Sequence, residues 1–337
     1  MKTKLGKIAL YTVPLLIGML LIWYSISILS EDEKSAIKNS FKSANYFWVG
    51  FALLLGVLSN LSRAYRFKFL LEPLGYKPKF LNSTMAIFTS YLINLLIPRS
   101  GEVVRATMHK KYDGIALDKV LGVVVAERIS DVFMLLLFIA IAFGLQAPLI
   151  EDILFKDSTK VGIVIKVILI ITIPFLFFKI YQLLEKSKNA NIQRVIKFIQ
   201  GLVSGVLSIV KMKKKWSFLL HTLFIWTLYL LMFYVGTFAI KEINNLSIDA
   251  VVVGFVVGAL SMTVSNGGLG WYPVLVSGAL IQFEVEKNAA LSFSWIIWTS
   301  QTVLVIIGGC ISFVLIPIYN DWLNRKKKRI IDTKQSI

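Results

Sequence analysis

The sequence has little of what soluble enzymes and metalloproteins use for chemistry. Its 337 residues include one cysteine, Cys310, and two histidines, His109 and His221. A single cysteine excludes a disulfide framework within the chain, and we expect Cys310, inside an apolar run, to be a small core residue. The two histidines are far apart and belong to no Cys/His cluster, so we expect them to be structural. The sequence predicts no metal, no cofactor and no catalytic residue.

Charged residues are also scarce. They make up 17% of the chain against 56% hydrophobic residues, and the mean hydropathy is +0.72. Soluble domains carry about 25% charged residues. Apolar runs of about 20 residues recur along the chain, long enough to cross a hydrocarbon core of about 30 Å, and most have no polar face at the helical period. These features predict an all-α polytopic integral membrane protein with about six to eight transmembrane helices.

We expect one membrane domain over residues 1–337, because no stretch suits a soluble domain. The predicted spans are 8–29, 46–62, 82–98 (re-entrant), 120–145, 161–178, 216–240, 250–280 (broken or re-entrant) and 291–317. The first span follows three lysines as a signal peptide does, but it is long and lacks a cleavage site, which indicates a retained anchor helix.

Basic residues are unevenly distributed between the loops. The net charge of +18 could indicate a nucleic-acid partner, but the basic residues lie in short loops between apolar spans, so we expect no nucleic acid. Of 37 basic residues, 28 lie in the N-terminus, 63–81, 99–119, 179–215 and 318–337, and 7 lie in 30–45, 147–160, 241–249 and 283–290. Cytoplasmic loops carry the excess of Lys and Arg, so both termini are predicted to be cytoplasmic.

This topology makes two segments enter and leave on the same side of the membrane. Segment 82–98 has cytoplasmic loops on both sides, segment 250–280 has external loops on both sides, and each contains a helix breaker. Two interrupted elements from opposite faces are typical of an inverted repeat. Irregular backbone at membrane depth must be buried in protein or line a watery cavity. We therefore expect the two segments to form the walls of a central site.

Two basic stretches are not predicted to be membrane spans. Residues 191–211 alternate apolar and polar positions at the helical period, which predicts an amphipathic helix either on the cytoplasmic leaflet or packed beneath the bundle. Residues 318–337 are predicted to be a basic cytoplasmic tail.

Charged residues within apolar spans usually face a bundle interior and have partners. Arg63 and Arg66 share one face at the end of the second span, where they either line a site or extend toward the headgroups. After the first break, Pro98 and Gly101 interrupt the helix. The charged residues of this region are Arg99, Glu102 and Arg105. Glu102 and Arg105 are three residues apart, so we expect them to pair if the helix restarts there.

A third charged group, Glu127, Arg128 and Asp131, interrupts the apolar run 120–145. Glu127 and Asp131 share a helical face, and Arg128 can reach Asp131. The charges of this group and of Arg99, Glu102 and Arg105 cancel, which suits a zwitterionic or anionic headgroup. The turn Asn266–Gly270 lacks the strand and the Lys-Ser/Thr of a nucleotide loop. It either binds an anionic group at a helix N-terminus or is a kink for tight packing.

These motifs resemble the lysylphosphatidylglycerol synthase transmembrane-region family, flippase-like membrane proteins that include the membrane half of the multiple peptide resistance factor. The resemblance covers about residues 8 to 318 and rests on Arg63, Arg66, Asn94, Pro98, Arg99, Gly101, Glu102, Arg105, Glu127, Arg128, Asp131, Gly267, Gly268 and Gly270. It implies translocation of a phospholipid or polyprenyl-linked lipid across the bacterial plasma (inner) membrane. The family's glycine turn often has Pro before it and Glu after it, where this chain has Asn266 and Tyr272-Pro273, so no acidic role is transferred to the turn.

The resemblance does not extend to lysyl transfer, because only residues 318–337 follow the last predicted span. The partners it implies are membrane lipids: anionic or zwitterionic phospholipids or polyprenyl-phosphate lipids. We expect the protein not to be an enzyme. Two alternatives stay open: a transferase acting on a lipid-linked substrate, and a non-catalytic scaffold for a separate lipid-modifying enzyme. A homo-oligomer is also compatible with the sequence.

Overall fold

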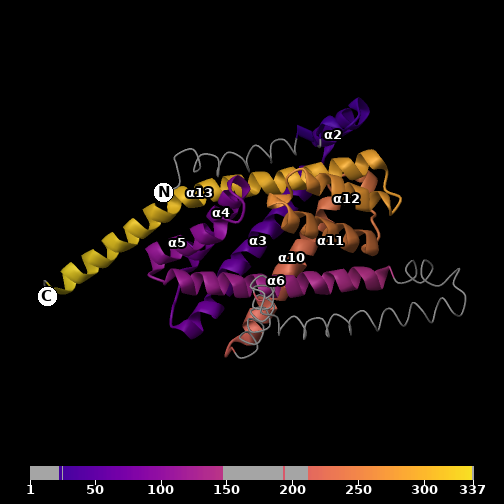
Figure 1. Cartoon of the computed structure of the whole chain (residues 1–337). Helices are drawn as coiled ribbons and strands as arrows, with labels where there is room; N and C mark the ends of the chain where they lie inside the picture. Colours follow the sequence, from indigo (N-terminus) through magenta and orange to yellow (C-terminus); the bar gives the residue numbers. More distant parts are fainter. Residues whose placement is uncertain (1–22, 25, 147–192, 194–211, 336–337) are drawn as a thin grey trace, which may run out of the picture.

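The computed structural model describes residues 23–24, 26–146, 193 and 212–335 (Figure 1). Throughout these ranges the regular structure is helical, with no strand. The predicted spans 161–178 and most of 8–29, and nearly all of the predicted amphipathic helix 191–211, lie outside the described residues.

Four described helices are long and apolar enough to cross a membrane. They are α3 (Tyr46–Leu71), α6 (Leu117–Leu145), α10 (Lys215–Thr237) and α13 (Lys287–Gln335). Large apolar side chains on their outer faces, such as Leu136, Phe143 and Phe313, are more than half exposed. A soluble protein rarely exposes so much contiguous apolar surface, whereas lipid tails accommodate it. The predicted all-helical, multi-pass membrane fold is thus confirmed.

The first helical hairpin consists of α4 (Phe80–Leu96) and α5 (Gly101–Asp113), which pack against each other. Pro98 forces the residue before it into extended backbone, and Ile97 accordingly ends α4 with φ −135°. The turn is closed by the Gly101 N–H, which donates to Asn94 Oδ1 at 2.7 Å. A Cβ at position 101 would lie 2.1 Å from the Ser90 carbonyl oxygen, so only glycine permits this close return.

The second hairpin consists of α11 (Ile248–Val264) and α12 (Trp271–Ile281), which also pack against each other. The turn between them contains the short helix η3 (Asn266–Gly268). Gly267 has φ +64°, a left-handed conformation that costs L-residues energy. The glycines therefore end α11 and let α12 restart in a new direction.

The long helix α13 supports both hairpins along its length. Trp298 Nε1 donates to the Gly267 carbonyl at the second turn at 2.9 Å. Further along, Gly309 lies against Leu92 of α4, and Asn320 Nδ2 donates to Asn82 Oδ1 at the start of α4 at 2.8 Å. Figure 1 shows α4 and α5 on one half of the bundle and α11 and α12 on the other. The hairpins thus approach each other from opposite ends of α13, as inverted-topology repeats do.

One end of the bundle carries α2 (Glu31–Ser43) and the short helix η2 (Lys241–Ile243). Lys287 Nζ lies 2.6 Å from Glu33 Oε1, so α2 is tied to the start of α13. The Lys287 ammonium and the Ser30 N–H hold the pKa of Glu33 below its usual range.

The opposite end carries η1 (Glu72–Leu74), where Lys214 Nζ lies 2.8 Å from Glu72 Oε1. Nearby, the buried His109 ring lies 2.9 Å from Asp113 Oδ2, and Asp113 also accepts from Asn82. Burial lowers the pKa of His109. The prediction that His109 is structural fits this position in a network that ties the end of α5 to α4.

Some bounds differ from the sequence prediction. Segment 30–45 contains a helix, α2, and α3 continues past residue 62 through Arg63 and Arg66, because acidic partners neutralise both charges inside the bundle. The predicted tail 318–337 is not separate, because α13 continues without a break to Gln335. Cys310 was expected in the core, which is wrong: it is exposed on the same outward face as neighbouring apolar side chains.

Candidate functional site

A buried ion cluster joins α3 to α6 in the middle of the protein. Arg63 Nη1 donates to Asp131 Oδ2 at 2.7 Å, and Arg66 Nη2 donates to Asp131 Oδ1 at 3.2 Å. The i,i+3 spacing places both arginines on one face of α3. Arg66 is fully buried, its Nη1 also donates to Thr222 of α10, and its guanidinium lies over the Phe218 ring. The alternative that these arginines extend toward headgroups is therefore wrong.

The cluster extends to α5 through Glu127. Arg105 Nη1 donates to Glu127 Oε2 at 2.6 Å, while Arg66 Nη2 lies 3.8 Å from Glu127 Oε1. The Arg105 guanidinium also lies over the Phe67 ring of α3, 4.0 Å from its centroid. Removing either partner of a buried pair leaves an uncompensated charge, which is strongly destabilising. Arg66, Arg105 and Glu127 therefore hold the first hairpin to the bundle.

A more exposed pair lies beside this cluster, where Arg128 Nη2 donates to Glu102 Oε1 at 2.9 Å. The sequence had suggested pairing within helices, Glu102 with Arg105 and Arg128 with Asp131. Both suggestions are wrong. Glu102 and Arg105 of α5 pair with Arg128 and Glu127 of α6, and Asp131 pairs with the two arginines of α3. The pairs across helices fix the hairpin to α6 in a way that local pairs would not.

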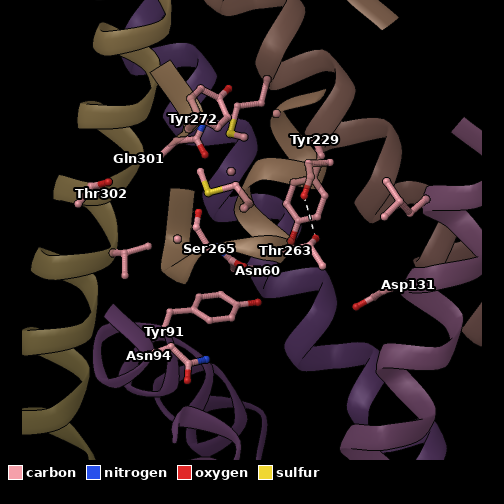
Figure 2. A pocket seen from close by; sticks show the side chains of 18 of the residues that line it. Asn60, Tyr91, Asn94, Asp131, Tyr229, Thr263, Ser265, Tyr272, Gln301 and Thr302 are labelled. Atoms are coloured by element: carbon pink, nitrogen blue, oxygen red, sulfur yellow. Dashed lines mark hydrogen bonds between the residues drawn. The ribbon is translucent and has the colours of Figure 1, made fainter. Parts of the chain in front are cut away.

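A cavity of about 630 Å³ opens next to these charges, between the two hairpins, α3, α6, α10 and α13. Figure 2 shows Tyr91 and Asn94 of α4 on one side, Asp131 of α6 opposite them, and Gln301 and Thr302 on α13. The walls contain both polar and apolar side chains. Such a volume is within the range of small-ligand pockets in proteins, roughly 300 to 1,000 Å³.

The hairpin turns meet at this cavity. A Cβ on Gly267 would lie 2.7 Å from Leu95 Cδ2, so the second turn contacts the end of α4. The second turn and the cavity lie near residues 298–305 of α13, close to the middle of its apolar stretch, because Trp298 bonds to Gly267 and Val305 lines the cavity. No charged residue occurs between positions 288 and 320 of α13. The cavity thus lies near the centre of the apolar layer.

The structure divides the residues predicted for this site into two groups. Those that line the cavity are Arg63, Asn94, Arg99, Glu102, Arg128, Asp131 and Gly267. Arg66, Arg105 and Glu127 support the walls from behind through the ion pairs described above. Pro98, Gly268 and Gly270 shape the turns without lining the cavity, and only the backbone of Asn266 is described.

Several uncharged polar residues of the cavity were missed by the sequence prediction. They are Asn60, Tyr91, Tyr229, Thr263, Ser265, Tyr272, Gln301 and Thr302. Asn60 precedes Arg63 by one helical turn on the same face, and this spacing could have identified it. Gln301 and Thr302 belong to a run of four polar residues, 299–302, inside the apolar stretch of α13, and this run could have identified them. The others are uncharged polar residues within apolar spans, a pattern that core residues share, so their sequence gives no clear signal.

The charges of the site are unbalanced once the arginines of α3 are included. Five arginines (63, 66, 99, 105 and 128) face three acids (Glu102, Glu127 and Asp131). The six charges counted in the sequence still cancel, and Arg63 and Arg66 of α3 add the positive surplus of the cluster as folded. Arg99, with φ 57° at the first turn, lines the cavity and forms no ion pair with any residue that the structure describes. The arrangement can therefore attract an anionic group.

A comparison with protein families gives one match over most of the chain. A family model described as "Lysylphosphatidylglycerol synthase TM region" matches residues 11–309. No curated protein and no solved structure matches the chain.

Proposed function

The chain belongs to the lysylphosphatidylglycerol synthase TM-region family, a membrane region linked to lipid handling, and on that premise we propose that it moves lipids between leaflets. The polar headgroup of a phospholipid or polyprenyl-phosphate lipid enters the central cavity while the tails stay in the surrounding lipid. The protein acts without catalysing a reaction on the lipid.

The observation that carries the proposal is the cavity of about 630 Å³ between the two hairpin turns. Moving a polar or charged headgroup through hydrocarbon without compensation is very costly. Side chains such as Arg99, Arg128 and Asn60 supply hydrogen bonds and charge that replace those of water. A cavity of this kind near the middle of the apolar layer lowers the barrier to crossing.

The arrangement of the hairpins supports movement as well as binding. The hairpins approach from opposite ends of α13, and the second turn contacts the end of α4 at the cavity. If each hairpin shields the cavity from one side, small displacements of either hairpin expose it alternately. The sequence contains no nucleotide-binding loop, so we propose that a lipid or ion gradient, or coupled lipid synthesis, drives the movement.

The charge distribution supports an orientation for this movement. The end with Lys79, Lys214 and the continuation of α13 carries the basic-rich loops, and the end with α2 carries few basic residues. We propose that the basic-rich end and both termini are cytoplasmic, in a bacterial plasma membrane. The lipid partners proposed are those of the bilayer itself.

Reconstituted vesicles test the proposal. Fluorescent short-tail phosphatidylglycerol is incorporated into both leaflets, and dithionite bleaches only the outer one, so faster total bleaching reports translocation. We expect total bleaching to be faster in vesicles that contain the protein than in protein-free vesicles. Thr302→Trp, which fills the cavity, should abolish the acceleration, whereas Val303→Trp on the adjacent exposed position of α13 should preserve it. No acceleration, or normal transport by folded Thr302→Trp, would contradict the proposal.

A further inference from the structure

The helix α13 leaves the bundle after Asn320. The Asn320 side chain is buried, where it donates to Asn82 and accepts from Lys79. Beyond it, the side chains described within 321–333 are exposed, apart from the half-buried Leu323. Figure 1 shows this yellow end of α13 running past α5. Among the elements that the structure describes, none covers this end of the helix.

Aromatic residues mark the depth of this end in the bilayer. Ile318 is exposed on the outer, apolar face of α13, and one turn later Trp322 is exposed as well. The Trp322 ring stacks on the Tyr319 ring, with their centroids 6.4 Å apart. Trp and Tyr are enriched where the hydrocarbon meets the headgroups. The hydrocarbon layer therefore ends near Trp322.

The end of α5 gives an independent mark of the same level. Lys79 Nζ donates to Asn320 Oδ1 at 3.1 Å and to the Tyr112 carbonyl at 3.2 Å, so the end of α5 lies beside Asn320. Lys110 and Lys111, just before Tyr112, are exposed. Charged side chains facing hydrocarbon are costly, so this level lies at the membrane surface.

Five consecutive basic residues, 325–329, follow this boundary, and we call them the basic collar. At a rise of 1.5 Å per residue the collar begins about 4.5 Å beyond Trp322 and covers about 7.5 Å of helix. The headgroup layer on each side of a bilayer is about 5–7.5 Å thick. Five successive positions make more than one helical turn, so basic positions occur on every side of α13. Headgroups surround a spanning helix on all sides, whereas a protein partner contacts one side.

The positive charges of the collar lack acidic partners in the part of the chain that the structure describes. Arg325, Lys326 and Arg329 are exposed and form no ion pair there. Asp321 and Asp332 are at helical spacing for pairing with Arg325 and Arg329, yet neither does so. Lys326 Nζ lies instead 5.3 Å from the centroid of the Trp322 ring, at the boundary. The collar is thus open to anions from outside the chain.

We infer that the basic collar binds the headgroups of anionic phospholipids from the bilayer around α13, at a site outside the central cavity. The inference goes beyond the proposed movement of lipids and does not depend on it. Lys and Arg at a membrane surface attract anionic lipids. Phosphatidylcholine carries its own cation beside its phosphate and has no net charge, so lipids with a net negative charge concentrate around the collar.

Fluorescence quenching in vesicles of the full chain tests the inference. Asn324→Cys in a Cys310→Ser background places a bimane label on an exposed position beside the collar. The vesicles are phosphatidylcholine with a small fraction of quencher, either phosphatidylglycerol or phosphatidylcholine with a nitroxide on its acyl chain. We expect the phosphatidylglycerol quencher to be about fivefold more effective at low salt. The preference should disappear at about 1 M salt, where the Debye length is about 3 Å.

Two triple variants locate the preference. The first removes three charges from the collar, through Arg325→Gln, Lys326→Gln and Arg329→Gln, and should reduce the preference to below about twofold. The matched control removes three charges from α2 at the opposite end of the bundle, through Lys34→Gln, Lys38→Gln and Lys42→Gln, and should leave it unchanged. The collar positions are exposed, so the melting temperature of the first variant should equal that of the wild type.

Equal quenching by the two lipids in the wild type would overturn the inference, and an acidic protein surface would then be the partner that suits the collar. A preference that survives in the collar variant, or that salt does not change, would overturn it as well. Quenching requires no lipid to cross the bilayer. A retained preference without vesicle transport would therefore contradict the proposed function alone.

Discussion

Arg63 Nη1 lies 2.7 Å from Asp131 Oδ2, and this contact joins α3 to α6 at the edge of the cavity. Arg66 Nη2 donates to the other oxygen of the same carboxylate, Asp131 Oδ1, at 3.2 Å. One acid thus balances two buried arginines on the neighbouring helix, and the wall of the cavity depends on it.

Asp131→Asn should therefore destabilise the protein strongly. The substitution keeps the shape of the side chain but removes the negative charge from two buried arginines, and breaking such a cluster costs about 3–5 kcal/mol. Thermal unfolding in detergent measures the loss. Asp118→Asn, at a largely exposed position near the start of α6, is the control and should be nearly neutral. Equal melting temperatures for both variants would show that the cluster contributes no stability.

Gly267→Ala should impair both stability and transport. At φ +64° an L-residue costs about 1–2 kcal/mol, and the added Cβ would lie 2.7 Å from Leu95. Pushing Leu95 away separates the turns of the two hairpins at the cavity. Gly278→Ala in α12 has open space around it and should be neutral or slightly stabilising. Melting temperature and the vesicle bleaching rate measure the two effects, and wild-type values for Gly267→Ala would contradict the proposed contact.

A cysteine in the cavity should react with a charged, water-soluble thiosulfonate reagent. Thr302 lines the cavity, whereas the native Cys310, on the same helix, is exposed on the apolar outer face. We expect Thr302→Cys in a Cys310→Ser background to be labelled in membranes, because a polar cavity admits water, and the wild-type Cys310 to be labelled far more slowly. Mass spectrometry measures the labelled fraction. Faster labelling of Cys310 would show that the cavity is dry.

The contact between Glu33 and Lys287 should make the docking of α2 depend on pH. The pKa of Glu33 is held below its ordinary value of 4.5 by Lys287 and the Ser30 N–H. Since the folded pKa is the lower one, the contact stabilises the protein above about pH 4.5 and is lost as the pH falls through the folded pKa. The melting temperature of the wild type should exceed that of Glu33→Gln at neutral pH, and the difference should shrink in acid. A constant difference would contradict this origin.

The sequence could predict the residues of the site whose effect is on their own backbone, but it could not predict contacts between helices. The breaks at Pro98 and at Gly267 were evident in the sequence, because proline and glycine act on their own backbone and neighbours. Charged residues inside apolar spans were also evident, since few positions tolerate them. Their partners were not, because Glu102 and Arg105 are adjacent on one helix and yet each pairs with α6.

The sequence by itself determined that the chain is a multi-pass helical membrane protein with two interrupted segments, because hydropathy and helix breakers act through short-range physics. Tertiary structure alone decided that the turns of the two hairpins meet beside Trp298, that Asp131 balances both Arg63 and Arg66, and that Asn60 and Gln301 line one cavity. These are contacts between residues far apart in the chain. They depend on how helices pack, and the composition of a single helix does not specify its neighbours.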